Sequence, residues 1–301
     1  MLFQTTQTMH KFATVTRPSL CSTPDLSRVC RLTVEDEKEV QAFLAVRPVH
    51  TVAMTSFIND NGMVSDLNRG EFYGSRDQDG NLEGVALIGH TTLVEARTDE
   101  ALKALAFAAR SATTPIHLIM SGGTAARTFW NYLDGFQNEP RIVCEELLFE
   151  VGFPFPVQKC EYDLRPARQE ELEAVAIAQA EVAEIECGVN PMVRDRDGFL
   201  ARVSRRIEQG RVFVVFDGDE LVFKADVVAQ TESVAYLEGV YVSPDHRGKG
   251  VGSSCLSRLC LELLGRVNNV CLLSNTELKG AHRSFIKAGM HSTGACTTLF
   301  V

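Results

Sequence analysis

A short glycine-rich loop between two apolar patterns constrains this chain more than any other feature of the sequence. Residues 235–242 form an apolar run that predicts a β-strand. Residues 243–245, Ser-Pro-Asp, end it, because proline cannot extend a central strand and aspartate favours turns. Beyond the loop, residues 255–264 carry apolar side chains at helical spacing. The loop 247–252 therefore joins the end of a strand to the start of a helix.

This arrangement is typical of a phosphate-binding loop. Glycines let the backbone curl so that its N–H groups point inward, and a helix N-terminus adds roughly half a positive charge. Arg247 and Lys249 add positive charge at the mouth of the loop. A dinucleotide fingerprint does not fit, because the glycines alternate, and a Walker A loop does not fit, because Gly250 follows the lysine. The alternative is a loop that binds no ligand and whose glycines recur by chance.

The composition is that of a globular protein with room for two domains. The chain has 301 residues, of which 45% are hydrophobic and 23% charged. Its net charge of −9 argues against a broad nucleic-acid or anionic-membrane surface, and no apolar run is long enough to span a membrane. The nine cysteines are odd in number and lack C-x-x-C spacing, which indicates free thiols in a reducing compartment and no metal site. We therefore expect a cytoplasmic protein.

The first 29 residues are rich in threonine and serine and hold no acidic residue before Asp25. This pattern weakly resembles a transit peptide but lacks the apolar core of a secretory signal. We expect a disordered tail over residues 1–29, with a start at Met9 as an alternative.

Two sets of strand and helix patterns follow the tail. Residues 30–156 predict, in order, a strand over 31–34, a helix over 35–46, a hairpin over 71–88, a helix over 99–110, a strand over 116–120, a helix after Thr124 and a strand over 147–151. Residues 157–301 predict a strand over 160–167, helices over 169–185 and 197–209, a hairpin over 211–229, the strand, loop and helix already described, a strand over 270–273, a helix over 279–288 and a strand near 297–301. The Phe-Pro-Phe-Pro run at 153–156 marks a linker between the sets, and His117, within a strand, is interpreted as structural.

Two motifs carry a resemblance to a known family. The Arg-x-x-Gly-x-Gly motif at 247–252, after a Val-x-Val-x-Pro strand end, resembles the acetyl-CoA pyrophosphate loop of the GNAT superfamily of N-acetyltransferases. Residues 281–290 resemble the family's fourth helix, usually A-x-x-x-Y-x-x-x-G-F. Residues 157–301 thus resemble a GNAT acetyltransferase domain and residues 30–156 a degenerate GNAT-like copy. The resemblance implies an α/β (α+β) fold of two tandem GNAT-like domains, each a mixed, mostly antiparallel twisted sheet flanked by helices.

The resemblance also implies a site for acetyl-CoA as co-substrate. Gly239 interrupts a well-packed strand, as glycine does at a bulge. In GNAT domains the central strand bulges and opens a V for the pantetheine arm. The resemblance places the following residues at the cofactor: Val240, Tyr241, Val242, Arg247, Gly248, Lys249, Gly250, Val251, Gly252, Ser253, Asn275 and Phe285.

Acyl transfer to an amine needs a base, because a protonated amine has no lone pair. Glu238 is the candidate catalytic residue, since it stands beside the predicted bulge in a run whose other ionisable side chains are two tyrosines. Apolar surroundings would raise its pKa towards neutrality, the range in which a general base works. The alternative is a carboxylate at a strand edge that is paired with a lysine or arginine.

Two positions depart from the family pattern. GNAT enzymes often have a tyrosine acid where this chain has Phe285, which cannot donate a proton. Leu278 stands where the family often has asparagine, and Asn275 is the candidate substitute in binding the cofactor. The thiolate is then expected to leave unaided or with a proton from water. Tyr241 is an alternative donor, or else a structural tyrosine.

Charged residues hint at where an acceptor enters. Glu181, Glu184 and Glu186 lie where GNAT domains usually line the acceptor pocket, and an acidic rim suits a cationic amine, whereas a solvated helix face is the alternative. Lys224 and Asp226 share one face of a predicted strand. They form either an ion pair at the floor of the cleft or a surface pair.

The sequence therefore predicts an acetyl-CoA-dependent N-acetyltransferase that transfers the acyl group directly from the thioester to an amine of a small molecule or peptide. No metal and no covalent acyl-enzyme are expected. The alternative is a non-catalytic acyl-CoA-binding sensor or scaffold, which Phe285 and the degenerate first half favour. Neither nucleic acid nor membrane is expected as a partner, and the chain is expected to be a monomer or a homodimer.

Overall fold

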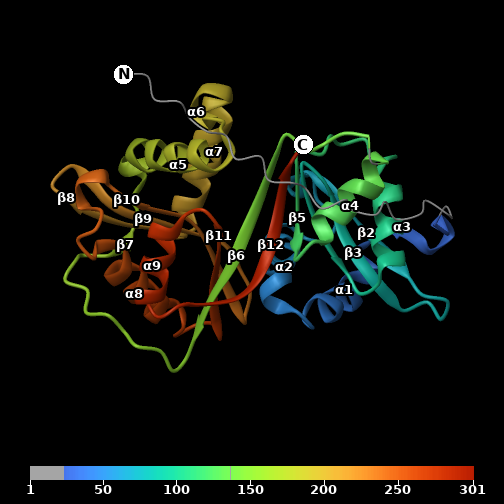
Figure 1. Cartoon of the computed structure of the whole chain (residues 1–301), viewed down its shortest axis with the longest axis horizontal. Helices are drawn as coiled ribbons and strands as arrows, with labels where there is room; N and C mark the ends of the chain where they lie inside the picture. Colours follow the sequence, from blue (N-terminus) through green and yellow to red (C-terminus); the bar gives the residue numbers. More distant parts are fainter. Residues whose placement is uncertain (1–23, 136) are drawn as a thin grey trace, which may run out of the picture.

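The computed structural model describes residues 24–135 and 137–301, and a single mixed sheet runs through all of this region (Figure 1). Its strands lie in the order β1-β2-β3-β4-β5-β12-β6-β11-β10-β9-β8-β7. The predicted mixed, mostly antiparallel pairing flanked by helices is confirmed, but the two predicted sheets, one in each half, form one continuous sheet. Residues 1–23 of the predicted tail lie outside the described residues, and residues 26–29 form a 3-10 turn, Leu26–Arg28, and the start of β1. No helix between residues 24 and 301 that the structure describes could span a membrane.

The first half of the sheet is antiparallel except for one parallel pair, β4 and β5. Its strands are β1 (Val29–Arg31), β2 (Gly70–Arg76), β3 (Leu82–Gly89), β4 (Thr91–Ala96) and β5 (Leu118–Gly122). Its helices are α1 (Glu37–Leu44), α2 (Pro48–Asn61), α3 (Asp99–Ala109) and α4 (Ala125–Asp134). Side chains alternate across a strand, so Leu93 packs with α1 and α2 while Val94 packs with α3 and α4 on the other face.

The second half repeats this plan, with β10 and β11 as the parallel pair. Its strands are β7 (Arg165–Pro166), β8 (Val212–Asp217), β9 (Glu220–Gln230), β10 (Val234–Val242) and β11 (Asn269–Asn275). Its helices are α5 (Leu172–Cys187), α6 (Pro191–Arg194), α7 (Arg196–Glu208), α8 (Val251–Leu263) and α9 (Lys279–Lys287). Helices α5 and α7 cover one face, and α8 and α9 cover the other.

The two halves exchange their last strands. Strand β6 (Ile142–Gly152) follows the first half in sequence but pairs with β11 of the second, with Glu146 opposite Asn275. Strand β12 (His291–Phe300) ends the second half but pairs with β5 of the first, with Cys296 opposite Gly122. The two long strands also pair with each other and cross the middle of the molecule (Figure 1). The predicted boundary between residues 156 and 157 stays a prediction, because the sheet is continuous across the halves.

Helix α2 belongs to the first half but packs on both. Its Met54 and Ile58 join the core of the first half, whereas Val52 packs beside strands of the second. At its end, Asp60 forms an ion pair with Arg211, with N–O distances of 2.6 and 2.8 Å. This helix was not predicted from the sequence, and neither was β4.

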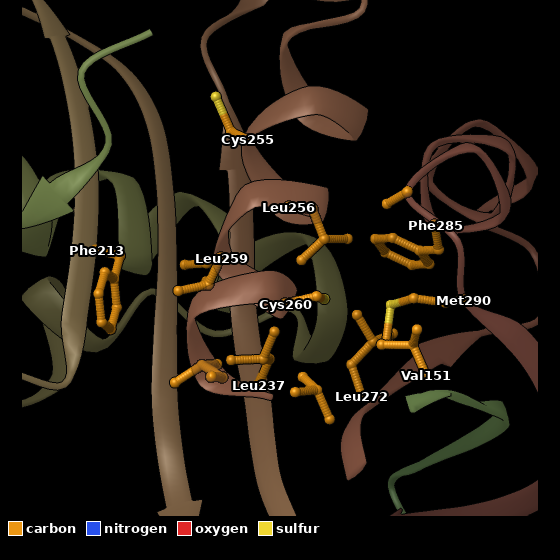
Figure 2. Packing of buried hydrophobic residues seen from close by; sticks show 14 of the residues in the cluster. Val151, Phe213, Leu237, Cys255, Leu256, Leu259, Cys260, Leu272, Phe285 and Met290 are labelled. Carbon is orange, nitrogen blue, oxygen red and sulfur yellow. The ribbon is translucent and has the colours of Figure 1, made fainter. Parts of the chain in front are cut away.

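The core of the second half holds α8 in place on the sheet (Figure 2). Leu256 and Leu259 of α8 are fully buried in one cluster with Leu237 of β10 and Leu272 of β11. Each such leucine contributes about 1.5–3 kcal/mol when it leaves water. The packing therefore fixes the position of the helix N-terminus, where the glycine loop ends.

Candidate active site

Strand β10 has the bulge that Gly239 predicts. Its pairing with β9 shifts between Glu238 and Tyr241, so that one extra residue lies on β10. Gly239 has a φ of 59°, and a Cβ atom there would collide with Gln179 and Lys224. Only glycine fits this backbone without strain.

Beyond the bulge, β10 and its parallel neighbour separate. The two strands pair from Val234 opposite Asn269 to Leu237 opposite Leu272. Strand β11 continues to Asn275 beside β6, while β10 continues beside β9 alone. Within the described residues, the main chain of β10 after Leu237 therefore lacks a strand partner on its β11 side. An extended ligand could pair with this edge as an added strand would.

The glycine loop presents free main-chain donors. Gly248 and Gly250 have φ values of 76° and 89°, and α8 begins directly afterwards without a side-chain cap. Across the described region of the chain, no partner is found for the N–H groups of residues 248–253. Residues 247–250 are exposed, whereas residues 251–253 are buried or half-buried. Unpaired amides at a helix N-terminus form a ready site for an anion.

The two basic residues of the loop behave differently. Arg247 folds back, because its Nε donates to the carbonyl of Val242 at 2.9 Å and its Nη2 lies 3.4 Å from Glu181. Its guanidinium also lies 6.0 Å from the ring of Tyr241. Lys249 is exposed at the mouth of the loop. Arg247 thus ties the loop to β10 and α5.

Glu238 lies at the point where the strands separate. The residue is exposed at the surface, but the surrounding protein partly desolvates its carboxyl group, and this desolvation raises the pKa of the carboxyl above the ordinary value. A carboxyl group that water reaches and whose pKa is raised is suited to exchange protons. Tyr236 lies two residues earlier on the same face and is buried.

Two further carboxyl groups lie close enough to Glu238 to interact with its charge. Glu146 of β6 lies on the face that Leu148 and Tyr236 share, and its Oε2 accepts a hydrogen bond from Thr298 at 2.6 Å. Glu186 lies at the end of α5, where its carbonyl accepts from the Cys144 thiol of β6 at 3.8 Å. Desolvation by the surrounding protein, together with the negative charge of neighbouring glutamates, raises the pKa of both Glu146 and Glu186 to about 7, although the Glu186 residue as a whole is exposed. Sequence reasoning missed Glu146, because only the strand exchange brings it here.

The other acidic residues named from the sequence do not gather at this point. Glu181 contacts Arg247, and Glu184 accepts a hydrogen bond from the side chain of Asn190 at 3.0 Å. Among the residues that the structure describes, no group of three histidine, cysteine or acidic side chains is arranged to hold a metal ion.

Lys224 and Asp226 form an interior ion pair beneath the bulge. Their charged atoms are 2.7 Å apart, and the side chains are 0% and 1% exposed. Lys224 also donates to the carbonyl of Gly239 at 3.2 Å, and Arg206 reaches Asp226 at 2.7 Å. Burial lowers the pKa of Lys224. The surface alternative is excluded, and the pair serves to hold the bulged backbone.

The two distant cofactor candidates lie in different surroundings. Asn275 ends β11, and its Oδ1 accepts the N–H of Glu277 at 2.9 Å. Phe285 of α9 is only 5% exposed and packs edge-on against Phe149, with ring centroids 5.4 Å apart. The phenyl ring therefore belongs to the core.

The first half lacks the corresponding anion site. Its loop between β4 and α3 contains no glycine, and Thr98 caps the helix by accepting the N–H of Ala101. Asp99 and Glu100 place negative charge in the first turn. In β4, Glu95 is held by Arg47 at 2.8 Å. Because Thr98 already caps the helix and two acidic residues follow it, this position suits a phosphate group less well than the start of α8 does.

Comparisons with known proteins agree with this geometry. Residues 208–289 match the family model described as an acetyltransferase (GNAT) domain. No curated protein matches the sequence.

Solved structures match nearly the whole chain. A GCN5-related N-acetyltransferase from Sphaerobacter thermophilus has a TM-score of 0.60 at 14% identity, over 92% of this chain and 96% of that one. A GNAT-family acetyltransferase from Colwellia psychrerythraea has a TM-score of 0.58 at 13% identity, over 90% and 98%. A tandem GNAT protein from the clavulanic acid biosynthesis pathway has a TM-score of 0.54 at 12% identity, over 90% and 98%. Such low identities establish a shared fold over both halves.

Proposed function

We propose that this chain, which has the fold of tandem GNAT proteins and carries a GNAT acetyltransferase domain in its C-terminal half, is an acetyl-CoA-dependent N-acetyltransferase. The observation that carries the proposal is the opened edge of β10 directly beside a loop with free amides. The opened edge suits the extended pantetheine arm of coenzyme A, and the free amides suit its pyrophosphate.

The chain's own groups would hold the cofactor as follows. The amides of residues 248–253 bind the pyrophosphate, with Lys249 nearby. The main chain of Val240 and Val242 pairs with the pantetheine arm along the opened edge. When bound, the cofactor supplies the acetyl thioester. A main-chain N–H at the bulge stabilises negative charge on the acyl oxygen, an effect worth about 3 kcal/mol in other acyl transfers.

Glu238 is the proposed base. Its raised pKa lets it take up the proton that the amine must lose. Glu146 and Glu186 place further negative charge near Glu238, and this charge attracts an amine that arrives as a cation. The acceptor is therefore a cationic amine on a small molecule or peptide.

The first test is direct binding. Calorimetric titration with CoA should give a saturable signal and raise the thermal unfolding temperature of the protein. Absence of both effects would overturn the cofactor site and the proposal with it.

The second test separates an enzyme from a sensor. In Glu238→Gln, we expect kcat/KM with cationic amines to fall by roughly 100-fold, because general base catalysis contributes about that much. The CoA affinity should stay unchanged, and Glu232→Gln, an exposed acid before β10, serves as the matched control. Normal CoA binding by a wild-type protein that acetylates none of a panel of polyamines, amino acids and peptides would favour the sensor.

A further inference from the structure

A lysine lies in the interior directly beneath the bulge of β10. The Nζ atom of Lys224, on β9, lies 2.7 Å from Oδ1 of Asp226, and the side chain is 0% exposed. Lys224 also donates hydrogen bonds to the side-chain oxygen of Gln179 and, at 3.2 Å, to the carbonyl of Gly239. A carboxylate, an amide oxygen and a carbonyl all accept, and a neutral amine would turn its lone pair towards one of them. The three contacts therefore match the protonated lysine, which has three N–H donors.

This cluster carries one excess positive charge. Lys224 and Arg206 flank a single carboxylate, because Arg206 reaches Oδ2 of Asp226 at 2.7 Å. Buried charges are expensive, and their replacement by apolar side chains often leaves a protein equally stable or more so. Stability of the fold therefore does not account for a lysine at this position. A positive charge beneath the bulge suits a ligand atom that becomes negative above it.

The carbonyl that Lys224 holds belongs to the same peptide group as the N–H of Val240. This peptide is trans, since the cis bond found in the described part of the chain is Phe153–Pro154. In a trans peptide, the C=O and the N–H point in opposite directions. The N–H of Val240 therefore points away from Lys224. Gly239 and Val240 are also the two residues that the register between β9 and β10 skips, so the ladder with β9 does not fix this peptide.

Glycine alone would leave the peptide free to turn. Gly239 has a φ of 59°, and glycine adopts positive and negative φ about equally readily. The Nζ of Lys224 lies 2.8 Å from the place that a Cβ atom on Gly239 would take, so the ammonium group occupies the space beside the glycine. Its hydrogen bond to the carbonyl selects one orientation of the peptide.

We propose that Lys224 is a positioning residue for acyl transfer, because it fixes the Gly239 carbonyl and so directs the N–H of Val240 to the acyl oxygen of acetyl-CoA, on the side of β10 that has no strand neighbour. This inference rests on the proposed function, since it concerns the same thioester. A cation bound to the carbonyl also polarises the peptide group and strengthens the hydrogen bond that its N–H donates. Lys224 thus acts on the substrate without touching it.

The test measures the polarisation of the thioester directly and needs no acceptor amine. Acetyl-CoA labelled with carbon-13 at the acetyl carbonyl is bound to the wild type and to Lys224→Met, and infrared difference spectra record its C=O stretching band. A hydrogen bond to the carbonyl oxygen lowers the frequency of this band. We expect a higher frequency in Lys224→Met than in the wild type, at an unchanged dissociation constant for CoA. Lys38→Met, which removes an exposed lysine of α1, is the matched control and should leave the band unchanged.

The kinetic constants give a second readout. With an amine that the wild type acetylates, we expect kcat to fall about tenfold in Lys224→Met while KM for acetyl-CoA stays unchanged. This loss is smaller than the roughly 100-fold or more that removal of an oxyanion donor costs, because the N–H of Val240 remains. A lysine that only supports the fold would instead lower the thermal unfolding temperature and the CoA affinity together.

The outcomes are separable. An unchanged carbonyl band in folded Lys224→Met overturns the inference, and so does a loss of CoA affinity without a change in the band. If Lys224→Met does not fold, the double variant Lys224→Met/Asp226→Leu, which removes both charges of the buried pair, is measured in the same way and decides. If the wild type binds no acetyl-CoA, the proposed function and this inference fall together, whereas failure of the variant test alone leaves the proposed function intact.

Discussion

Two carboxyl groups near Glu238 should make the stability of the protein depend on pH. Glu146 and Glu186 have pKa values of about 7, against an ordinary value of 4.5, because burial and neighbouring glutamates disfavour their ionised forms. Such a group stabilises the folded state below pH 4.5, and this contribution is lost as the pH rises through about 7. The ionised carboxylates that would attract a cationic amine therefore lower the stability of the folded protein.

Replacing Glu146 with a neutral residue should remove the loss of stability that its ionisation causes. We expect Glu146→Gln to unfold about 2 °C higher than the wild type at about pH 8, since a gain on the order of 1 kcal/mol shifts a protein of this size by that much. At pH 4.5 the two proteins should melt together, because the wild-type carboxyl is then protonated. Differential scanning calorimetry over this pH range measures the difference, and a difference that does not depend on pH would contradict the assignment.

At the scale of single elements, the bulge in β10 couples the backbone to the buried pair beneath it. Gly239 needs both a positive φ and empty space, because Gln179 and Lys224 occupy the position of a side chain. Gly218, in the turn between β8 and β9, has nearly the same φ of 57° but has no atom within 4 Å of an added Cβ. Comparing substitutions at these two glycines separates the effect of backbone strain from the effect of steric crowding.

Alanine at these two positions should therefore have unequal effects. We expect Gly239→Ala to lower the free energy of unfolding by about 3 kcal/mol and Gly218→Ala by about 1 kcal/mol, because only the first adds a collision to the strained backbone. Urea denaturation measures both values. CoA affinity should fall in Gly239→Ala alone, and equal losses of stability would show that crowding at the bulge has no effect.

Continuous apolar runs in the sequence predicted the strands that are buried on both faces. The hairpin over 211–229 and the strand before the glycine loop were found in this way, and both are present. Helix α2 was missed, because it buries Met54 and Ile58 towards one half and Val52 towards the other, which leaves no single apolar stripe. The predicted strand over 160–167 was wrong for most of its length, and only Arg165–Pro166 pairs with β8.

The whole molecule depends on the exchange of β6 and β12, which no local pattern signals. The prediction of one sheet for each half implied that β6 and β12 pair within their own halves. Instead, β6 pairs with β11 of the second half and β12 pairs with β5 of the first. The exchange also explains why Glu238 could be named from the sequence while Glu146 could not. Glu238 stands next to its motif, whereas Glu146 arrives from the other half of the chain.

Separated halves should therefore fail to fold alone. We expect residues 24–156 and 157–301, produced singly, to aggregate, because β5 and β11 would each lose a neighbour and expose an edge. Produced together, they should elute as one complex in size-exclusion chromatography. A soluble, native-like monomer of either half would contradict the coupling that the sheet implies.

The exchange also sets the order of events on the ribosome. Strands β1 to β5 emerge early, yet the strand that lies beside β5 is β12, at residues 291–300. In the nascent polypeptide, one edge of β5 therefore stays unpaired while residues 123–290 are translated. During this interval β6 is the nearest strand along the chain that could pair wrongly with β5, so chaperone protection matters most in this window of synthesis.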